Sequence, residues 1–185
     1  DHTALAGEPQ RAVAVEGRGV EVGVGRAFGQ REAAQAAVRP AHAHDRAQAA
    51  VQLAAAGLGD VIMSAHVFNA KLDPEHPATL SRSVITGLLR EKLGFQGLIV
   101  SDDMEMKAIS AHYGLENSLP AAIAAGVDVL CLGNNLSYDP DIATKAVGIL
   151  ERAVTSGCLP EARIDESCER VLASKRQAGI LASGP

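Results

Sequence analysis

The chain has 185 residues and a formal net charge of −5, and this length is enough for one sizeable hydrophobic core. The negative charge and the scarcity of aromatic residues (two Tyr, three Phe and no Trp) exclude the usual features of a nucleic-acid partner. No apolar run approaches the roughly 20 residues that a bilayer-spanning helix needs, so no membrane partner is expected. Three cysteines without a CxxC spacing predict neither structural zinc nor a disulfide framework, and no metal or cofactor is expected.

The first fifty residues differ in composition from the rest of the chain. They contain no Ile, Lys, Ser, Asn, Met, Cys or Tyr, and Ala, Gly, Val and Arg dominate them. Alternation in residues 13–28 is typical of a glycine-weakened strand pair, and residues 30–38 and 45–57 have the composition of Ala-rich helices. Nothing in this segment forms a strand–turn–helix unit with a clear core face. We interpret residues 1–50 as an atypical segment, non-native or poorly packed, and residues 51–185 as the folded region.

From about residue 50 onward, short apolar runs alternate with helical segments. Residues 59–67, 96–103 and 127–133 predict three buried strands. Helices are expected over residues 80–95, 104–114, 118–126, 139–157 and 160–179. This alternation of strands and helices is typical of βα units, so the sequence predicts an α/β fold with a parallel sheet.

Capping residues set the expected helix boundaries. Ser81 is suited to cap the helix that follows it, and Gly94 to end that helix. Gly126 is expected to end the helix over 118–126, with Pro120 in its first turn. The last helix is expected to open at Asp165.

Polar residues follow each of the three predicted strands. In parallel α/β sheets the carboxyl ends of the strands form the functional face, so His66, Asp102 and the Asn134-Asn135 pair are expected to meet there. Asp102 is closest to a strand end and is the better candidate for a carboxylate presented to a ligand. Asp103 is interpreted as structural, capping the next helix or bracing the loop. Taken alone, His66 is more often a hydrogen-bonded structural histidine, and the asparagine pair fits an ordinary turn.

The residues by themselves leave several kinds of site open. A histidine and an aspartate at neighbouring strand ends suit a glycosidase nucleophile, a magnesium-dependent carboxylate site or the phosphoacceptor aspartate of a receiver domain. A receiver site needs an acidic pair at an early strand end and a lysine after the last strand, and the sequence has neither in those places. On the pattern alone, Met104 and Met106 are interpreted as packing residues.

Three segments in the same order and spacing resemble the catalytic barrel of glycoside hydrolase family 3. They read IMSAHVFNAKLDPEHPATLS over residues 62–81, LLREKLGFQGLIVSDDMEMKAI over 88–109 and AIAAGVDVLCLG over 122–133. The resemblance covers residues 53–181 and is greatest to the β-N-acetylhexosaminidase branch. It implies a partial TIM-like (β/α) barrel and a carbohydrate substrate. It also implies that the full-length parent hydrolyses terminal β-linked N-acetylhexosamine, or a related β-glycoside, by a retaining mechanism.

The resemblance also implies roles for single residues. Asp102 falls on the family's nucleophile, His66 and Met106 on the wall of the sugar pocket, and Asp73 on a structural position. The branch carries its acid/base on a loop reading approximately KHFPGHG followed by DSH, and the 185 residues contain no such segment. We therefore expect a C-terminal part of a catalytic barrel that carries the nucleophile only, weakly active or inactive alone. The alternative is a non-catalytic remnant with a vestigial sugar pocket.

Overall fold

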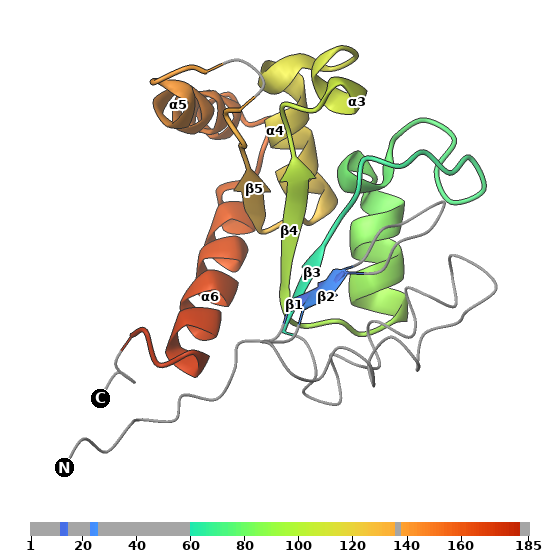
Figure 1. Cartoon of the computed structure of the whole chain (residues 1–185), viewed down its shortest axis with the longest axis vertical. Helices are drawn as coiled ribbons and strands as arrows, with labels where there is room; N and C mark the ends of the chain where they lie inside the picture. The colour runs from blue at the N-terminus through green and yellow to red at the C-terminus, as the bar shows by residue number, and fades with distance from the viewer. Residues whose placement is uncertain (1–11, 15–22, 26–59, 136–137, 182–185) are drawn as a thin grey trace.

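The computed structural model describes residues 12–14, 23–25, 60–135 and 138–181 of the chain. Five strands form one sheet in the order β2-β1-β3-β4-β5 (Figure 1). These are β1 (Ala12–Ala14), β2 (Gly23–Gly25), β3 (Val61–Met63), β4 (Leu98–Asp103) and β5 (Val129–Cys131). Strands β1, β3, β4 and β5 run parallel, and β2 is antiparallel to β1. The predicted α/β fold with parallel strands in sequence order is confirmed.

Two of the strands come from the compositionally atypical first fifty residues. β1 and β2 lie in and beside the alternating stretch over residues 13–28 and pair as an antiparallel ribbon. The helices expected over 30–38 and 45–57 lie outside the described residues. The division of the chain near residue 50 therefore stays a prediction.

Helical segments follow the parallel strands in the expected order. They are η1 (Ala78–Leu80), η2 (Ser83–Lys92), α3 (Lys107–Ser110), α4 (Gly114–Ala125), α5 (Ile142–Thr155) and α6 (Glu161–Gln177). η2 has π-helical turns, and at its end the backbone N–H of Leu93 donates to the carbonyl of Leu88, five residues earlier. Within the described part of the chain, no helix has the length and apolarity to cross a membrane.

The helix-capping predictions are confirmed for η2 and for the end of α4. The Ser81 hydroxyl accepts a hydrogen bond from the backbone N–H of Val84 at 3.2 Å. Gly94 and Gly126, which follow η2 and α4, have φ angles of +71° and +119°. These left-handed conformations favour glycine and turn the chain out of each helix.

Two predicted helix starts are wrong. α4 begins at Gly114, where φ is +63°, so Pro120 lies inside the helix and not in its first turn. The burial of Leu119 and Ala122 in the core outweighs the hydrogen bond that the proline removes. α6 begins at Glu161 directly after Pro160, which leaves Asp165 in its second turn. The fixed φ of a proline makes it a good residue at a helix start.

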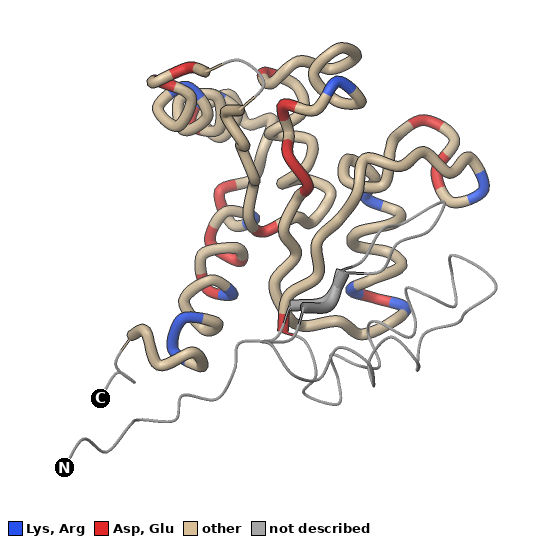
Figure 2. The backbone as a smooth tube through the Cα atoms, viewed as in Figure 1, with Lys and Arg blue, Asp and Glu red and all other residues tan. Residues whose placement is uncertain are grey.

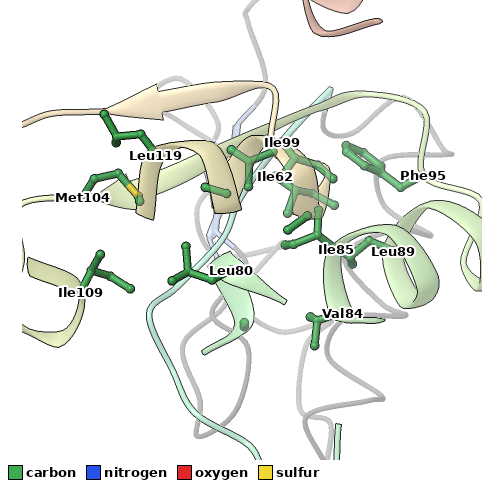
Figure 3. Packing of buried hydrophobic residues seen from close by; sticks show 14 of the residues in the cluster. Ile62, Leu80, Val84, Ile85, Leu89, Phe95, Ile99, Met104, Ile109 and Leu119 are labelled. Carbon is green, nitrogen blue, oxygen red and sulfur yellow. The ribbon is translucent and has the colours of Figure 1, made fainter. Parts of the chain in front are cut away.

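The hydrophobic core lies between the parallel strands and the helices η2, α3 and α4 (Figure 3). Ile62 of β3 and Ile99 of β4 are completely buried and pack in one cluster with Ile85 of η2 and Leu119 of α4. Each such side chain contributes about 1.5–3 kcal/mol by leaving water. Met104 is fully buried in the same cluster, so its interpretation as a packing residue is confirmed.

A buried cluster of charged side chains connects α6 to the edge of the sheet where the parallel strands begin. Asp128, just before β5, has a completely buried carboxylate that accepts hydrogen bonds from Arg90, Arg163 and Arg170, and from the backbone N–H of Ile99. Burial, opposed by the Asp128 charge, lowers the pKa of Arg90 to about 10, so this guanidinium remains charged at neutral pH. Sequence analysis missed the cluster because Asp128 sits within an apolar run.

Candidate active site

Strands β3, β4 and β5 run parallel, so their carboxyl ends point toward the same edge of the sheet, and β3 ends opposite Val100 in β4 (Figure 1). Acidic residues occupy this end of β4, the middle strand of the three (Figure 2). The imidazole Nε2 of His66 lies 2.9 Å from the carbonyl oxygen of Asp103, and the backbone N–H of Gly133 donates to Asp103 Oδ1 at 3.0 Å. His66, after β3, and Gly133, after β5, therefore both contact Asp103 at the end of β4, while the predicted grouping of His66 and Asn134 with Asp102 stays a prediction.

The end of β4 departs from regular pairing with β5. Val100 is opposite Val129 and Asp103 is opposite Cys131, so β4 carries one extra residue in this interval. The fully buried Ser101 hydroxyl accepts the backbone N–H of Cys131 at 2.9 Å and so replaces a ladder hydrogen bond. A bulge of this kind redirects the side chains around it.

Asp102 stands in this irregular interval and is partly exposed. Its Oδ1 accepts a hydrogen bond from the backbone N–H of Asp103 at 2.8 Å. Among the described residues, no side chain or backbone group donates to its Oδ2, and no cation pairs with the carboxylate. One carboxylate oxygen is thus held in place, while the other has no hydrogen-bond donor within the part of the chain that the structure describes.

Asp103 braces the loops, which is one of the two structural roles expected for it. Its Oδ1 accepts the backbone N–H groups of Glu105 and Gly133, both at 3.0 Å. It does not cap α3, whose N-cap position is Met106 and which has no side-chain cap. A β-carbon on Gly133 would collide with the Asp103 carboxylate, so this close approach requires glycine.

A turn after β5 contacts the loop after β4. Asn134 has a φ angle of +50°, as expected for an asparagine turn. Its side chain accepts from the backbone N–H of Asp139 at 2.7 Å and donates to the Asp139 carbonyl at 2.9 Å. The Asn134 backbone N–H donates to the Glu105 carboxylate. Sequence reasoning missed Glu105, because a single Glu after a strand is usually only solvated.

His66 and Met106 occupy the same edge of the sheet. Both ring nitrogens of His66 have protein partners, since Nδ1 lies 3.0 Å from Thr79 Oγ1 and Nε2 contacts the Asp103 carbonyl. The backbone N–H of Met106 donates to that same carbonyl at 3.0 Å. The Met106 side chain is 39% exposed, so it is not a core residue like Met104.

The Asp73 loop follows β3 and has a structural role. The Asp73 carboxylate accepts from the Ser81 hydroxyl at 2.6 Å and from the backbone N–H groups of Glu75 and His76. The hydrogen bond from Ser81 is the main reason that the pKa of Asp73 falls to about 2. The implied structural position of Asp73 is consistent with these contacts.

The carboxylates make the strand ends electrostatically negative. Partial burial, with the charges of Asp103 and Asp102 added, raises the pKa of the Cys131 thiol above its usual range. The thiol therefore stays protonated at neutral pH and is a poor nucleophile. In the described part of the chain, no three His, Cys, Asp or Glu side chains come together in a way that would hold a metal ion.

Residues 45–174 match the model of the glycosyl hydrolase family 3 N-terminal domain. The chain belongs to glycoside hydrolase family 3. A solved family 3 β-N-acetylglucosaminidase from Paenibacillus sp. str. FPU-7 is similar over 75% of this chain and 25% of its own, with 37% identity and a TM-score of 0.64. The partial TIM-like barrel is thereby confirmed as the fold of this family 3 chain.

Relatives compared by sequence are glycosidases by name. A β-hexosaminidase of Tolumonas auensis is 42% identical over 84 residues, which cover 45% of this chain and 25% of the relative. A β-N-acetylglucosaminidase/β-glucosidase of Cellulomonas fimi is 31% identical over 104 residues, or 56% of this chain and 17% of the relative. The family 3 chain thus spans a quarter or less of the length of these two relatives.

Proposed function

We propose that this chain contributes the nucleophile to a retaining β-N-acetylhexosaminidase, with Asp102 as the nucleophile. The observation that carries the proposal is the position of Asp102 at the carboxyl end of β4, between β3 and β5, with an Oδ2 to which no group among the described residues donates. Membership of glycoside hydrolase family 3 and the names of the relatives support a β-linked carbohydrate substrate.

In this mechanism Asp102 Oδ2 attacks the anomeric carbon of the terminal sugar. The bond from that carbon to Asp102 forms as the bond to the leaving oxygen breaks, and a general acid protonates the leaving oxygen. Water then attacks the glycosyl-enzyme, which releases the sugar and restores the carboxylate with net retention. The negative charge of the strand ends, which together with burial raises the pKa of Cys131, favours the positive charge that develops on the sugar ring.

The neighbouring residues receive supporting roles in the proposal. Because both His66 nitrogens are bonded within the protein, His66 is proposed to line the pocket with its ring edge and to orient the β4 end. Met106 is proposed to offer an exposed apolar surface to the sugar. Since the sequence lacks a KHFPGHG segment, the proposal assigns no acid/base to this chain.

Covalent trapping tests the assignment of the nucleophile. A full-length enzyme that contains this segment is incubated with a slow fluorinated glycoside, digested, and its labelled peptide sequenced by mass spectrometry. Label is expected on Asp102, and Asp102→Asn should abolish labelling while substrate binding is largely kept. Label on Asp103 or Glu105 would contradict the proposal.

A non-catalytic remnant is the second candidate, favoured by the absence of the acid/base motif from the sequence. The trapping experiment separates the two candidates. A remnant binds N-acetylglucosamine without forming any covalent adduct, even when the full-length protein is used. Labelling of Asp102 in that protein would exclude the remnant.

A further inference from the structure

A line of hydrogen-bonded side chains runs from the interior of the fold to the end of β4. Ser64 Oγ lies 3.0 Å from Thr79 Oγ1, Thr79 Oγ1 lies 3.0 Å from His66 Nδ1, and His66 Nε2 lies 2.9 Å from the Asp103 carbonyl oxygen. Ser64 and Thr79 are 1% and 0% exposed. Ser64 directly follows β3, and Thr79 lies in η1, so two separate elements supply the hydroxyls.

The direction of each hydrogen bond follows from the group at the end of the line. A backbone carbonyl only accepts, so His66 Nε2 must carry the hydrogen and donate it to Asp103. In a neutral imidazole the other nitrogen then accepts, which requires Thr79 to donate its hydroxyl hydrogen to Nδ1. Thr79 Oγ1 in turn accepts from the Ser64 hydroxyl. A single tautomer satisfies every contact.

We propose that Ser64 and Thr79 are positioning residues that act on Asp102 through His66. This inference deepens the proposed function and rests on it, because it assumes that Asp102 is the nucleophile. The backbone of Asp103 is held at both ends, its N–H by Asp102 Oδ1 and its carbonyl by His66 Nε2. Fixing the His66 ring holds the carbonyl of the Asp103–Met104 peptide, and through the Asp103 Cα it restrains the adjoining Asp102–Asp103 peptide, whose N–H donates to Asp102 Oδ1. The Asp102 carboxylate is thereby restrained in its direction.

The residue before Thr79 closes the loop that carries the Thr79 hydroxyl. The backbone N–H of Ala78 donates to the Val67 carbonyl at 2.9 Å, which closes the loop back onto the segment after β3. Ser64 is tied to the sheet, since its backbone N–H donates to the Val100 carbonyl at 2.8 Å. The line is thus built on the sheet and a closed loop, which suits a positioning role.

The test uses the 185-residue chain and needs neither sugar nor turnover. NMR couplings within the imidazole ring of His66, assigned by comparison with His66→Gln, report the tautomer at about pH 8, where ordinary imidazoles are neutral. The Nε2–H tautomer is expected in the unmodified chain. Hydrogen exchange of the Asp103 N–H reports the link to Asp102. Thr79→Val should change the Nδ1 shift and lower the exchange protection about 2- to 10-fold.

Two further variants make the result specific. Thr79→Ser keeps the hydroxyl. It should therefore keep the His66 Nδ1 shift and the exchange protection of the Asp103 N–H that the unmodified chain shows. Thr86→Val deletes a different hydroxyl, which donates to the Ala125 carbonyl at 2.7 Å, and should leave both signals unchanged. If Thr79→Val does not fold, Ser64→Ala is measured in its place. Its Nδ1 shift and Asp103 N–H protection should change in the same direction as expected for Thr79→Val, but by less.

Several outcomes would overturn the inference. These are an Nδ1–H tautomer in the unmodified chain, unchanged His66 and Asp103 signals in Thr79→Val, or equal changes in Thr86→Val. Failure of the proposed function gives a different result, because covalent label would then fall on a residue other than Asp102 whatever the His66 tautomer is.

Discussion

At the scale of single residues, glycine at position 133 decides how closely two loops approach. The Gly133 backbone N–H donates to the Asp103 carboxylate, and a β-carbon would occupy the space of that carboxylate. Asp103 also accepts from Glu105, so it moves only by giving up hydrogen bonds. A residue without catalytic chemistry thus controls the geometry next to Asp102.

We expect Gly133→Ala to destabilise the chain by about 1–3 kcal/mol, because the Asp103 hydrogen bonds are lost or distorted. Gly148→Ala in α5 is the matched control, and we expect it to change the free energy of unfolding in the opposite direction. Its β-carbon meets only the flexible end of Arg152, at 3.4 Å, so it should stabilise by about 0.5–1 kcal/mol. Urea unfolding measures both, and equal effects would contradict the close-approach argument.

At the scale of elements, the contact between α6 and the sheet depends on one buried carboxylate. Arg163 and Arg170 are seven residues apart, two helical turns, so both face Asp128. Arg90 reaches the same carboxylate from η2. Asp128 therefore joins three elements that are far apart in the sequence.

Asp128→Asn is expected to cost about 3–5 kcal/mol, since three partly buried guanidinium groups lose their common anion. Glu166→Gln is the control. The Glu166 carboxylate is 57% exposed and lies 3.6 Å from Arg163 and 3.8 Å from Arg170, so its loss should cost less than about 1 kcal/mol. Denaturant midpoints from circular dichroism compare the two variants. Similar midpoints for Asp128→Asn and Glu166→Gln would show that the Asp128 cluster does not stabilise the packing of α6.

The stability of the chain should fall at acid pH because of Asp73, in the loop after β3. The Ser81 hydroxyl and two backbone N–H groups lower the pKa of Asp73 from 3.8 to about 2. The unfolded chain then binds more protons between these values, so the contribution of Asp73 to stability is full above about pH 4 and is lost as the pH falls through about 2.

In an NMR titration of the Asp73 carboxyl group, Ser81→Ala should raise its pKa toward 3.8. Asp73→Asn should remove this part of the pH dependence of unfolding while leaving the rest. An unchanged Asp73 pKa in Ser81→Ala would contradict the assigned cause.

At the scale of the whole molecule, the chain carries the end of a barrel sheet and not a closed barrel among its described residues. A (β/α) barrel needs eight strands to close and to surround its pocket. General acid–base catalysis, for which the sequence carries no recognised motif, typically contributes about 10²–10⁴-fold.

We therefore expect the 185-residue chain to hydrolyse aryl N-acetyl-β-glucosaminides at a rate no different from that of its Asp102→Asn variant. Release of the aryl alcohol, followed by absorbance with a full-length family 3 enzyme as positive control, measures this rate. Robust turnover by the 185-residue chain that Asp102→Asn removes would contradict this expectation.

The sequence alone determined the strand and helix order, the parallel sheet, and the strand ends that carry Asp102, His66 and Asn134. The sequence also predicted that Gly94 ends η2. These features follow from local patterns, since apolar periodicity and capping depend on neighbours in the chain.

Only the tertiary structure decided the contacts between distant residues. The Asp128 cluster joins residues from 90 to 170, the Ser64–Thr79–His66 line ends on Asp103, and the bulge in β4 is defined by its register with β5. The start of α4 also departed from local rules, because core burial tolerated Pro120 inside the helix. The start of α6 after Pro160 instead follows the local preference of proline for helix starts. Hydrogen-bond direction and register depend on which groups the fold brings together, and no local pattern encodes that.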